Sequence, residues 1–222
     1  MSSHHVVINN QEPALIIANG ESCELALILD LLEWSPTVVV LDGAIRRVLD
    51  YEIKFDVWLG DFDSVSVDEL KSHPALEQVE IVHTPDQDKT DLQKAIEYLI
   101  NKGIPAANII WAGGRRTDHH LNNLLTLARY SDKITLTSID DYDKLYVLPK
   151  KFSKWYKKGT QLSLIPCGIA TEVQTANLVW NLNGETLELP HFVSSSNEVL
   201  KDGFVEINYT NGYLLMVENW KA

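Results

Sequence analysis

Cysteine is almost absent from this chain of 222 residues, which contains only Cys23 and Cys167. The two lie far apart and lack the spacing of a thiolate metal site, which argues against a disulfide framework and against a zinc site built from cysteine. Long apolar runs are missing as well. No run approaches the roughly 20 residues of a membrane span, and the first residues show no basic flank followed by an apolar core. We therefore expect a cytoplasmic protein without a membrane anchor.

Basic residues are scarce, with 19 Lys and Arg against 31 Asp and Glu and a formal net charge of −12. Such a surface repels nucleic acids and anionic membranes over most of its area, so we expect neither as a partner. A phosphate-bearing substrate must then meet a local cationic site or arrive with its metal. The 45% of hydrophobic residues suffices for one large domain or two ordinary ones.

The first part of the chain alternates apolar runs with helical stretches. The runs are ALIIA (14–18), TVVVLD (37–42), DVWLGD (56–61), VEIVHT (79–84), NIIWAG (108–113) and KITLTS (133–138). They are rich in Val and Ile with little alternation, as is typical of parallel strands covered on both faces. Helical i, i+3, i+4, i+7 spacing occurs at Leu92, Ala95, Ile96 and Leu99, and again at Leu121, Leu124, Leu125 and Ala128. We expect a doubly wound α/β domain with a mostly parallel sheet.

The sequence pattern changes after about residue 145. Short β-prone segments follow one another: KLYVL, TQLSLIP, ATEVQTANLVW, ETLELP, VEINYT and YLLMVE, separated by KKG, NLNG and TNG. No helical period remains. We predict an antiparallel β-sandwich over residues 144–222 after the α/β domain of residues 1–143.

Charged residues gather where the predicted parallel strands end. They are Asp42, then Asp61 and Asp63, then Asp86, Asp88 and Asp91, and finally Arg115, Arg116 and Asp118. In open α/β sheets the carboxyl ends of the strands share one edge, where ligands bind, so these groups are expected to converge. Any one of these aspartates has an alternative interpretation as a turn or helix N-cap residue. Four strand ends with the same pattern favour a site.

The residue types indicate a magnesium and phosphate site. Asp61 and Asp63, two positions apart, repel each other unless a cation lies between them, and carboxylates without nearby His or Cys suit Mg²⁺. Arg115 and Arg116 follow a glycine pair and can face phosphate oxygens, although a solvated basic turn is the alternative. There is no P-loop motif. Lys89 is a lesser phosphate candidate.

Five ordered blocks of the sequence resemble the thiamine pyrophosphokinase family. The blocks are GDFDS (60–64), TPDQDKTD (84–91), GGRRTDHHLNN (113–123), NLVWNL (178–183) and SSSNE (194–198). The resemblance implies an α/β ATP-binding domain, a β-sandwich that binds thiamine and dimerises, and a homodimer with composite sites. It also implies that the enzyme transfers the pyrophosphoryl group of ATP to thiamine and releases AMP.

The resemblance also implies roles for single residues. The metal and catalytic positions are Asp61, Asp63 and Asp91, with Mg²⁺ as the cofactor. The nucleotide positions that match the family motifs are Gln87, Thr90, Arg116, Asp118 and Asn123. To these we add Asp42, Asp88, Lys89 and Arg115, which follow the predicted strands but are not assigned by the resemblance. The thiamine positions are Trp180, which stacks on thiamine from the partner subunit, together with Ser194, Ser196 and Asn197. Without the resemblance, a Trp in a β domain is typical of a core or interface, and the serines are typical of a loop.

Three residues depart from the family pattern. Ala44 stands where the family has a second glycine, Arg46 where it has an asparagine, and Arg115 where a glycine often precedes the arginine. We expect altered nucleotide geometry there and the same reaction.

Two other functions remain open: a Mg²⁺-dependent phosphohydrolase, and a regulatory protein that binds nucleotide or thiamine without catalysis. The separate β domain argues against a phosphohydrolase, because hydrolysis needs no site for a second organic substrate. The acidic residues argue against a regulatory protein, because a protein that only binds has no need of mutually repelling carboxylates.

Overall fold

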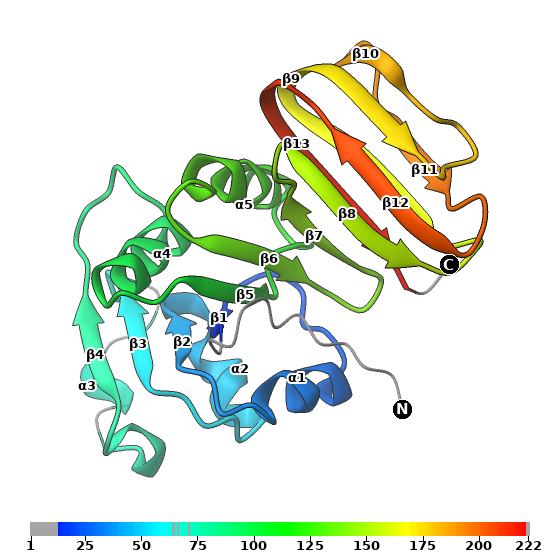
Figure 1. Cartoon of the computed structure of the whole chain (residues 1–222). Helices are drawn as coiled ribbons and strands as arrows, with labels where there is room; N and C mark the ends of the chain where they lie inside the picture. The colour runs from blue at the N-terminus through cyan, green and yellow to red at the C-terminus, as the bar shows by residue number, and fades with distance from the viewer. Residues whose placement is uncertain (1–12, 64, 66, 71, 221–222) are drawn as a thin grey trace. The chain divides into compact units, whose positions relative to one another are not determined.

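The computed structural model describes residues 13–63, 65, 67–70 and 72–220. Ser64 of the GDFDS block and the N-terminal stretch that was predicted to lack a leader lie outside the described residues. The chain divides into two compact units, shown in Figure 1. Unit 1 comprises residues 13–126 and 130–136, and unit 2 comprises residues 127–129 and 137–220. No described helix is long and apolar enough to cross a membrane.

The described part of unit 1 contains five parallel strands in the order β4-β3-β2-β1-β5. Their bounds are β1 Ala14–Ile17, β2 Val38–Leu41, β3 Val57–Gly60, β4 Glu80–His83 and β5 Ala106–Ile110. Every residue of β1, β2 and β3 is buried, because side chains on both faces of these Val- and Ile-rich strands are covered. The predicted parallel arrangement of the N-terminal strands is confirmed.

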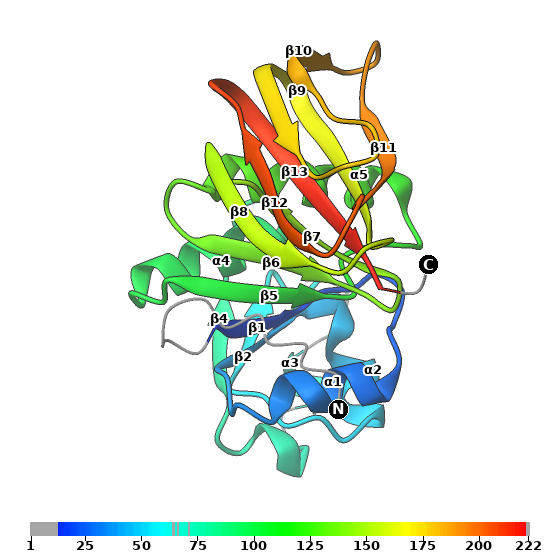
Figure 2. The same ribbon diagram turned by 45° about the vertical axis from the view of Figure 1, so that its right-hand side comes forward.

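Helices connect these strands. The α-helices are α1 Leu25–Leu32, α2 Ile45–Asp50, α3 Val67–Leu70, α4 Asp91–Asn101 and α5 Thr117–Tyr130, and the 3-10 turns are Asp42–Ala44 and Pro74–Leu76. Figures 1 and 2 show α1 and α2 on one side of the strands and α4 on the other. In α4 the predicted apolar stripe faces the strands, since Leu92, Ala95, Ile96 and Leu99 are all buried.

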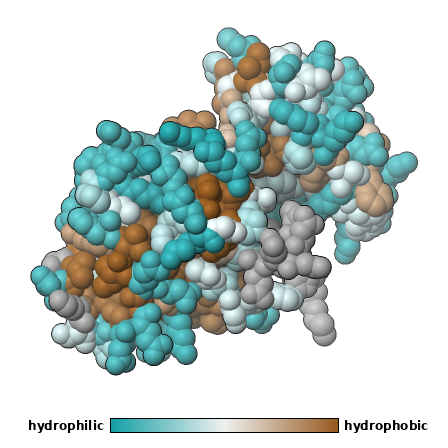
Figure 3. All heavy atoms as spheres, turned by 60° about the vertical axis from the view of Figure 1, so that its left-hand side comes forward, coloured by the Kyte–Doolittle hydropathy of each residue, from teal (hydrophilic) through white to brown (hydrophobic). Residues whose placement is uncertain are grey.

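Two expectations about burial are wrong. Strand β4 was expected to be covered on both faces, but Ile81 is 40% exposed. Among the described strands β4 pairs with β3 alone and forms the edge of the sheet. Figure 3, in which the side of the molecule carrying β4 comes forward, shows apolar surface among polar side chains there. In α5 the predicted stripe is only partly covered: Ala128 is buried and Leu124 half-buried, but Leu121 and Leu125 are exposed. The Asn123 amide donates a hydrogen bond of 2.8 Å to the Ala112 carbonyl, which ties α5 to the segment after β5.

Unit 2 is built from antiparallel strands. Their bounds are β7 Asp143–Val147, β8 Lys151–Tyr156, β9 Gln161–Ala176, β10 Asn183–Glu188, β11 Ser194–Glu198, β12 Gly203–Asn208 and β13 Asn211–Asn219, while β6 Thr135–Ile139 crosses the division between the units. The order is β6-β7-β13-β9-β12-β8, with β10 and β11 also paired to β9. The predicted antiparallel strands are confirmed. A division into two sandwich layers stays a prediction.

Sequence reasoning missed two of these strands and misjudged the length of a third. The segment KFSKWY forms β8, although its apolar residues are interrupted by lysines and a serine. The serines at 194–196, which resemble a loop by composition, begin β11 because β9 supplies backbone partners for them. The segments TQLSLIP and ATEVQTA are one continuous strand, β9.

A buried carboxylate joins strands of unit 2 that are not neighbours in the sheet. Glu218 on β13 accepts hydrogen bonds from the hydroxyls of Tyr146 on β7 and Tyr156 on β8, the latter at 2.6 Å. Lys154 on β8 and Lys144 on β7 approach the same carboxylate at 2.9 and 3.2 Å. Because β9 and β12 separate β8 from β13, these contacts require the sheet to curl, which encloses the apolar core of the unit.

We predict that Glu218→Gln lowers the free energy of unfolding at pH 7 by about 3 kcal/mol, because it leaves two lysines around a neutral amide. Burial alone would raise the pKa of Glu218, but the charges of Lys144 and Lys154 and the tyrosine hydroxyls outweigh it, so the pKa lies below its ordinary value of 4.5. A lowered pKa stabilises the folded state above that ordinary value, and this stabilisation is lost as the pH falls through the folded-state pKa.

Urea unfolding between pH 7 and pH 3 checks this expectation. The difference in the free energy of unfolding between the wild type and Glu218→Gln should shrink below pH 4.5, the ordinary pKa of the carboxyl group. Glu206→Gln, at an exposed position of β12, is the matched control and should show no such trend. A difference that stays constant over the whole pH range would contradict the assignment.

Candidate active site

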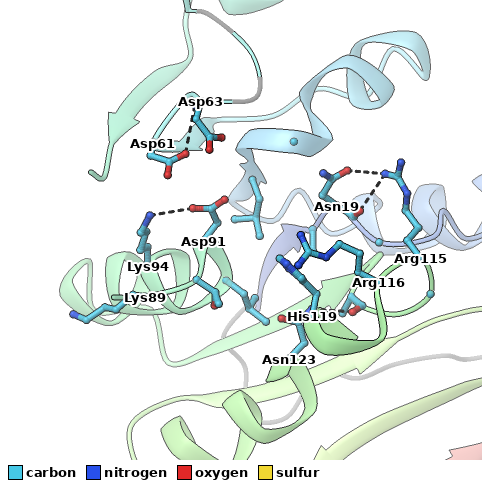
Figure 4. Close-up of a pocket in the computed structure, with 18 of the residues that line it drawn as sticks. Asn19, Asp61, Asp63, Lys89, Asp91, Lys94, Arg115, Arg116, His119 and Asn123 are labelled. Carbon is cyan, nitrogen blue, oxygen red and sulfur yellow. Dashed lines mark hydrogen bonds and ion pairs between the residues drawn. The ribbon is translucent and has the colours of Figure 1, made fainter. Parts of the chain in front are cut away.

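A pocket of about 500 Å³ lies at the carboxyl edge of the parallel strands, and all its lining residues belong to unit 1. The charged and polar lining residues are Asn19, Asp61, Asp63, Gln87, Lys89, Thr90, Asp91, Lys94, Arg115, Arg116, His119 and Asn123. Figure 4 shows carboxylates at one end of the pocket and arginines at the other. The predicted convergence of the strand ends is therefore present in the structure.

Three carboxylates form the acidic end. Asp42, Asp61 and Asp63 each offer an oxygen atom, and these atoms all lie within 4.8 Å of one another. Asp42 is buried just after β2, whereas Asp61 and Asp63 follow β3. Gly60 makes this possible, because a Cβ atom at residue 60 would lie 2.3 Å from the Cβ of Asp42. Any side chain at residue 60 would force Asp42 away from the other two.

The loop that carries two of these carboxylates is anchored by the residue between them. Phe62 has a φ of +60°, which is uncommon for a bulky side chain and turns the backbone sharply. Its ring packs edge-on against Trp58 with the centroids 4.7 Å apart and stacks on His83 at 5.8 Å. These contacts hold the turn between Asp61 and Asp63.

Asp61 is kept ionised by its neighbours. The Gln87 amide donates to its Oδ2 at 2.9 Å, and the Asp63 backbone N–H faces its Oδ1 at 3.5 Å. The Gln87 hydrogen bond, ahead of smaller contributions from Asp63 and Lys94, lowers the pKa of Asp61. An acceptor-only carboxylate at the pocket surface is the form that binds a cation.

Asp91 lies at the start of α4 and has a different environment. Lys94 approaches its Oδ1 at 3.2 Å, and the Lys94 side chain is almost fully buried. Burial raises the pKa of Asp91, and the opposing effect of Lys94 does not cancel it. The preceding Thr90 caps α4 through a capping box with Gln93. Thr90 therefore fixes the start of the helix that carries Asp91.

The cations at the pocket have distinct partners. Lys89 forms an ion pair of 2.8 Å with Glu97, and in Figure 4 its side chain points away from the carboxylates. Arg116 makes a two-pronged contact with Asp118, at 3.2 and 2.6 Å. The hydrogen bond from Arg116 lowers the pKa of Asp118 to about 2. Both side chains of this pair are largely exposed, so the guanidinium lies at the mouth of the pocket.

Asn19 organises the other end of the pocket. Its side-chain oxygen accepts from Arg115 at 3.1 Å and from Arg47 at 3.0 Å. The Arg47 guanidinium also lies 4.6 Å above the centroid of the Trp111 ring. Arg115 has a φ of +50°, in the left-handed region that favours glycine, which explains why a glycine suits this position. The arginine adds a hydrogen bond to Asn19 that a glycine would lack.

The other two departures from the family pattern are accommodated. Ala44 is fully buried with φ −88° and ψ −19°, a conformation that alanine adopts readily, so a glycine is not required there. Arg46 forms an exposed ion pair of 2.8 Å with Glu69 and does not line the pocket. The expected change in nucleotide geometry at these two positions stays a prediction.

The structure and the sequence-based site overlap incompletely. Most predicted nucleotide residues line the pocket, Asp42 joins the carboxylate cluster, and Asp88 and Asp118 are outside the lining. Sequence reasoning missed Asn19 and Lys94. Asn19 follows β1 as the other site residues follow their strands, and Lys94 lies one helical turn after Asp91. Both residues could therefore have been identified from their spacing in the sequence.

The predicted thiamine residues lie in unit 2. Trp180 is 63% exposed, in the turn between β9 and β10. Ser196 is exposed with a φ of +53°, and its backbone N–H donates to the Ser163 hydroxyl at 2.9 Å. Ser194 is half-buried and Asn197 is buried, 2% exposed. An exposed indole beside serine hydroxyls can offer a flat apolar face and polar contacts to an aromatic ligand.

The parallel strands and a pocket with carboxylates at one end and arginines at the other define an α/β protein suited to a metal-bound polyphosphate. Comparisons with known proteins identify its family. Residues 28–138 match the family model "Thiamin pyrophosphokinase, catalytic domain", and residues 148–214 match "Thiamin pyrophosphokinase, vitamin B1 binding domain". The chain belongs to the thiamin pyrophosphokinase family.

Similar proteins agree with this assignment. Thiamine pyrophosphokinase 1 of Oryza sativa subsp. japonica is 32% identical over 190 residues, 72% of this chain and 71% of the relative. Thiamin pyrophosphokinase 1 of Caenorhabditis elegans is 27% identical over 199 residues, 82% of this chain and 79% of the relative. The crystal structure of the yeast enzyme shares the fold, with a TM-score of 0.81 at 18% identity, and covers 96% of this chain and 88% of its own. The predicted family and the predicted activity, pyrophosphorylation of thiamine with ATP as donor, are confirmed.

Proposed function

We propose that the pocket of unit 1 binds ATP with Mg²⁺ and that thiamine is delivered to it by the surface around Trp180. The observation that carries this proposal is the meeting of Asp42, Asp61 and Asp63 at the edge of the parallel sheet. In this proposal residues 1–143 serve as the nucleotide-binding catalytic domain, and residues 144–222 bind thiamine and form the dimer.

The donor set fits the metal. Three carboxylate oxygens within 4.8 Å of one another match the preference of Mg²⁺ for hard oxygen ligands. Asp61 and Asp63 hold the ion, and buried Asp42 is the third ligand that the geometry supports. Asp91 keeps its predicted place beside the metal, because it lines the same pocket. When bound, Mg²⁺ neutralises charge on the triphosphate oxygens.

The cations of the pocket orient the triphosphate. Arg116 at the mouth can exchange its contact with Asp118 for a phosphate, because both groups are exposed. Arg115 is held by Asn19 in a fixed orientation and offers a second guanidinium. Lys94 stays beside Asp91. Lys89 is already paired with Glu97, which makes it the weakest of the phosphate candidates.

Thiamine binding is assigned to unit 2 because the described lining of the pocket includes no Phe, Tyr or Trp. Trp180 supplies the stacking surface, Ser194 and Ser196 border it, and Asn197 belongs to the same group. We propose that these residues act on the pocket of the partner subunit in a homodimer with composite sites. The family resemblance supports this arrangement, and so does the exposure of Trp180 in the single chain.

A cytoplasmic location is part of the proposal. Cys23 is buried and Cys167 is half-buried, and neither forms a disulfide in the described part of the chain. Thiols that are kept reduced are typical of intracellular proteins.

The metal assignment predicts that Asp61→Asn lowers turnover at least about a hundredfold, because a charge that holds the metal on the triphosphate is lost. The fold should persist, since removing one of three mutually repelling carboxylates relieves repulsion in the metal-free protein. Steady-state kinetics at several Mg²⁺ concentrations and the melting temperature check both parts. Asp50→Asn, an equal change of charge at an exposed position of α2, should behave as the wild type. Near-normal turnover of Asp61→Asn would overturn the assignment.

The composite site predicts that two defective chains restore each other. Heterodimers of one Asp61→Asn chain and one Trp180→Ala chain contain one site with neither lesion and one site with both. Differently tagged chains allow such heterodimers to be purified after subunit exchange. At low thiamine concentration they should reach about half the activity of the wild-type dimer, because one of two equivalent sites is intact.

Low thiamine is required because stacking on the indole contributes on the order of 1 kcal/mol beyond buried area, so Trp180→Ala retains activity at saturation. Each parental homodimer, assayed alone, provides the control. If purified heterodimers give only the mean activity of the two parents, each site lies within one chain.

A further inference from the structure

The exposed Trp180 lies in a short turn that is fastened to β11 on one side. The turn follows the end of β9, and Leu178 in its first part forms an isolated bridge with Val199, the residue directly after β11. The next residue continues this pairing, since the Val179 N–H donates to the Glu198 carbonyl at 2.8 Å. These bonds stop short of the tryptophan itself.

The side chain of Asn197 continues the pairing at Trp180. Its Oδ1 accepts from the Trp180 backbone N–H at 3.2 Å, and its Nδ2 donates to the Trp180 carbonyl at 2.7 Å. The amide group thus takes the place that the peptide group of a neighbouring strand would occupy, with one donor and one acceptor facing the same residue. Both backbone groups of Trp180 are thereby held by one side chain.

The remaining capacity of the Asn197 amide is also used. Its Oδ1 accepts a second bond from the Glu198 N–H at 2.9 Å, and its Nδ2 donates a second bond to the Ser194 hydroxyl at 3.1 Å. A side-chain amide has two donor hydrogens and one oxygen with two lone pairs, so all four sites are occupied. Asn197 is also only 2% exposed. A ligand could contact this amide only by displacing one of these bonds.

We infer that Asn197 is a positioning residue: it fixes the backbone of Trp180, and through its Ser194 contact the neighbouring hydroxyl, so that the indole is presented to thiamine in one orientation. This inference rests on the proposed function of Trp180 and assigns Asn197 an indirect role. Ordering the indole before binding removes part of the entropy cost of binding. Loss of Asn197 should therefore weaken thiamine binding and spare ATP binding.

A double-mutant cycle tests the indirect role. Asn197→Ala should raise the KM for thiamine about fivefold, the size of one lost stacking contact, with the KM for ATP changed less than about twofold. In the Trp180→Ala background, Asn197→Ala should add less than about a further twofold, because the side chain that it positions is absent. An unchanged KM for thiamine in Asn197→Ala, or effects that multiply in the double variant, would overturn the inference.

A second measurement observes Trp180 directly and does not depend on catalysis. The full chain is labelled with 5-fluorotryptophan, and the ¹⁹F resonance of Trp180 is assigned by its loss in Trp180→Phe. In Asn197→Ala this resonance should shift or broaden while those of the other tryptophans stay in place. An unchanged Trp180 resonance would refute the positioning role.

Control variants separate this role from general destabilisation. Tyr209→Phe removes another buried hydrogen bond of unit 2, from the Tyr209 hydroxyl to the Leu148 carbonyl at 2.6 Å, and should leave both the KM for thiamine and the Trp180 resonance unchanged. If Asn197→Ala does not fold, Asn197→Asp keeps the volume and the acceptor but sets an oxygen against the Trp180 carbonyl, and the same changes are expected. If Trp180→Ala alone leaves the KM for thiamine unchanged, the proposed function of Trp180 fails, and the ¹⁹F measurement still decides the positioning role.

Discussion

The close approach of the Gly60 backbone to the Asp42 side chain is the constraint on which the acidic end of the pocket depends. Strands β2 and β3 run in parallel register, so their carboxyl ends bring Asp42 and Asp61 to neighbouring positions. Only a residue without a Cβ leaves room for a buried carboxylate at that point. The turn at Phe62 then returns Asp63 to the same place. One glycine and one aromatic anchor therefore gather three charges that would otherwise separate.

The arginine end of the pocket is formed by loops at the same edge of the sheet. The loops after β1 and β5 are joined by backbone bonds, including one of 2.6 Å from the Gly20 N–H to the Trp111 carbonyl. A side chain at residue 20 would collide with that carbonyl, so glycine is required there too. These bonds hold Asn19 and Arg115 opposite the carboxylates. The two kinds of charge are thus kept apart by backbone structure, and a polyphosphate with its metal can bridge them.

Much of the fold could be predicted from the sequence, because hydrophobic periodicity indicates which faces of the helices and strands are buried. The parallel strands of unit 1 and helix α4 follow directly from their apolar runs. Side-chain direction was harder to predict, since it depends on contacts between distant segments. Sequence alone could not show that Lys89 turns toward Glu97, or that the amide of Asn197 is fully occupied by backbone groups and the Ser194 hydroxyl. Strand β8 was missed because its pattern is interrupted by lysines, one of which reaches the buried Glu218.

The most direct test of the account is the dependence of AMP formation on thiamine. The purified chain is incubated with ATP and Mg²⁺, with and without thiamine, and AMP and thiamine diphosphate are quantified. Equal amounts of the two products, formed only when thiamine is present, are expected, because the proposed reaction transfers the pyrophosphoryl group to the hydroxyl of thiamine. Release of AMP or phosphate at the same rate without thiamine, or no AMP under any condition, would contradict it.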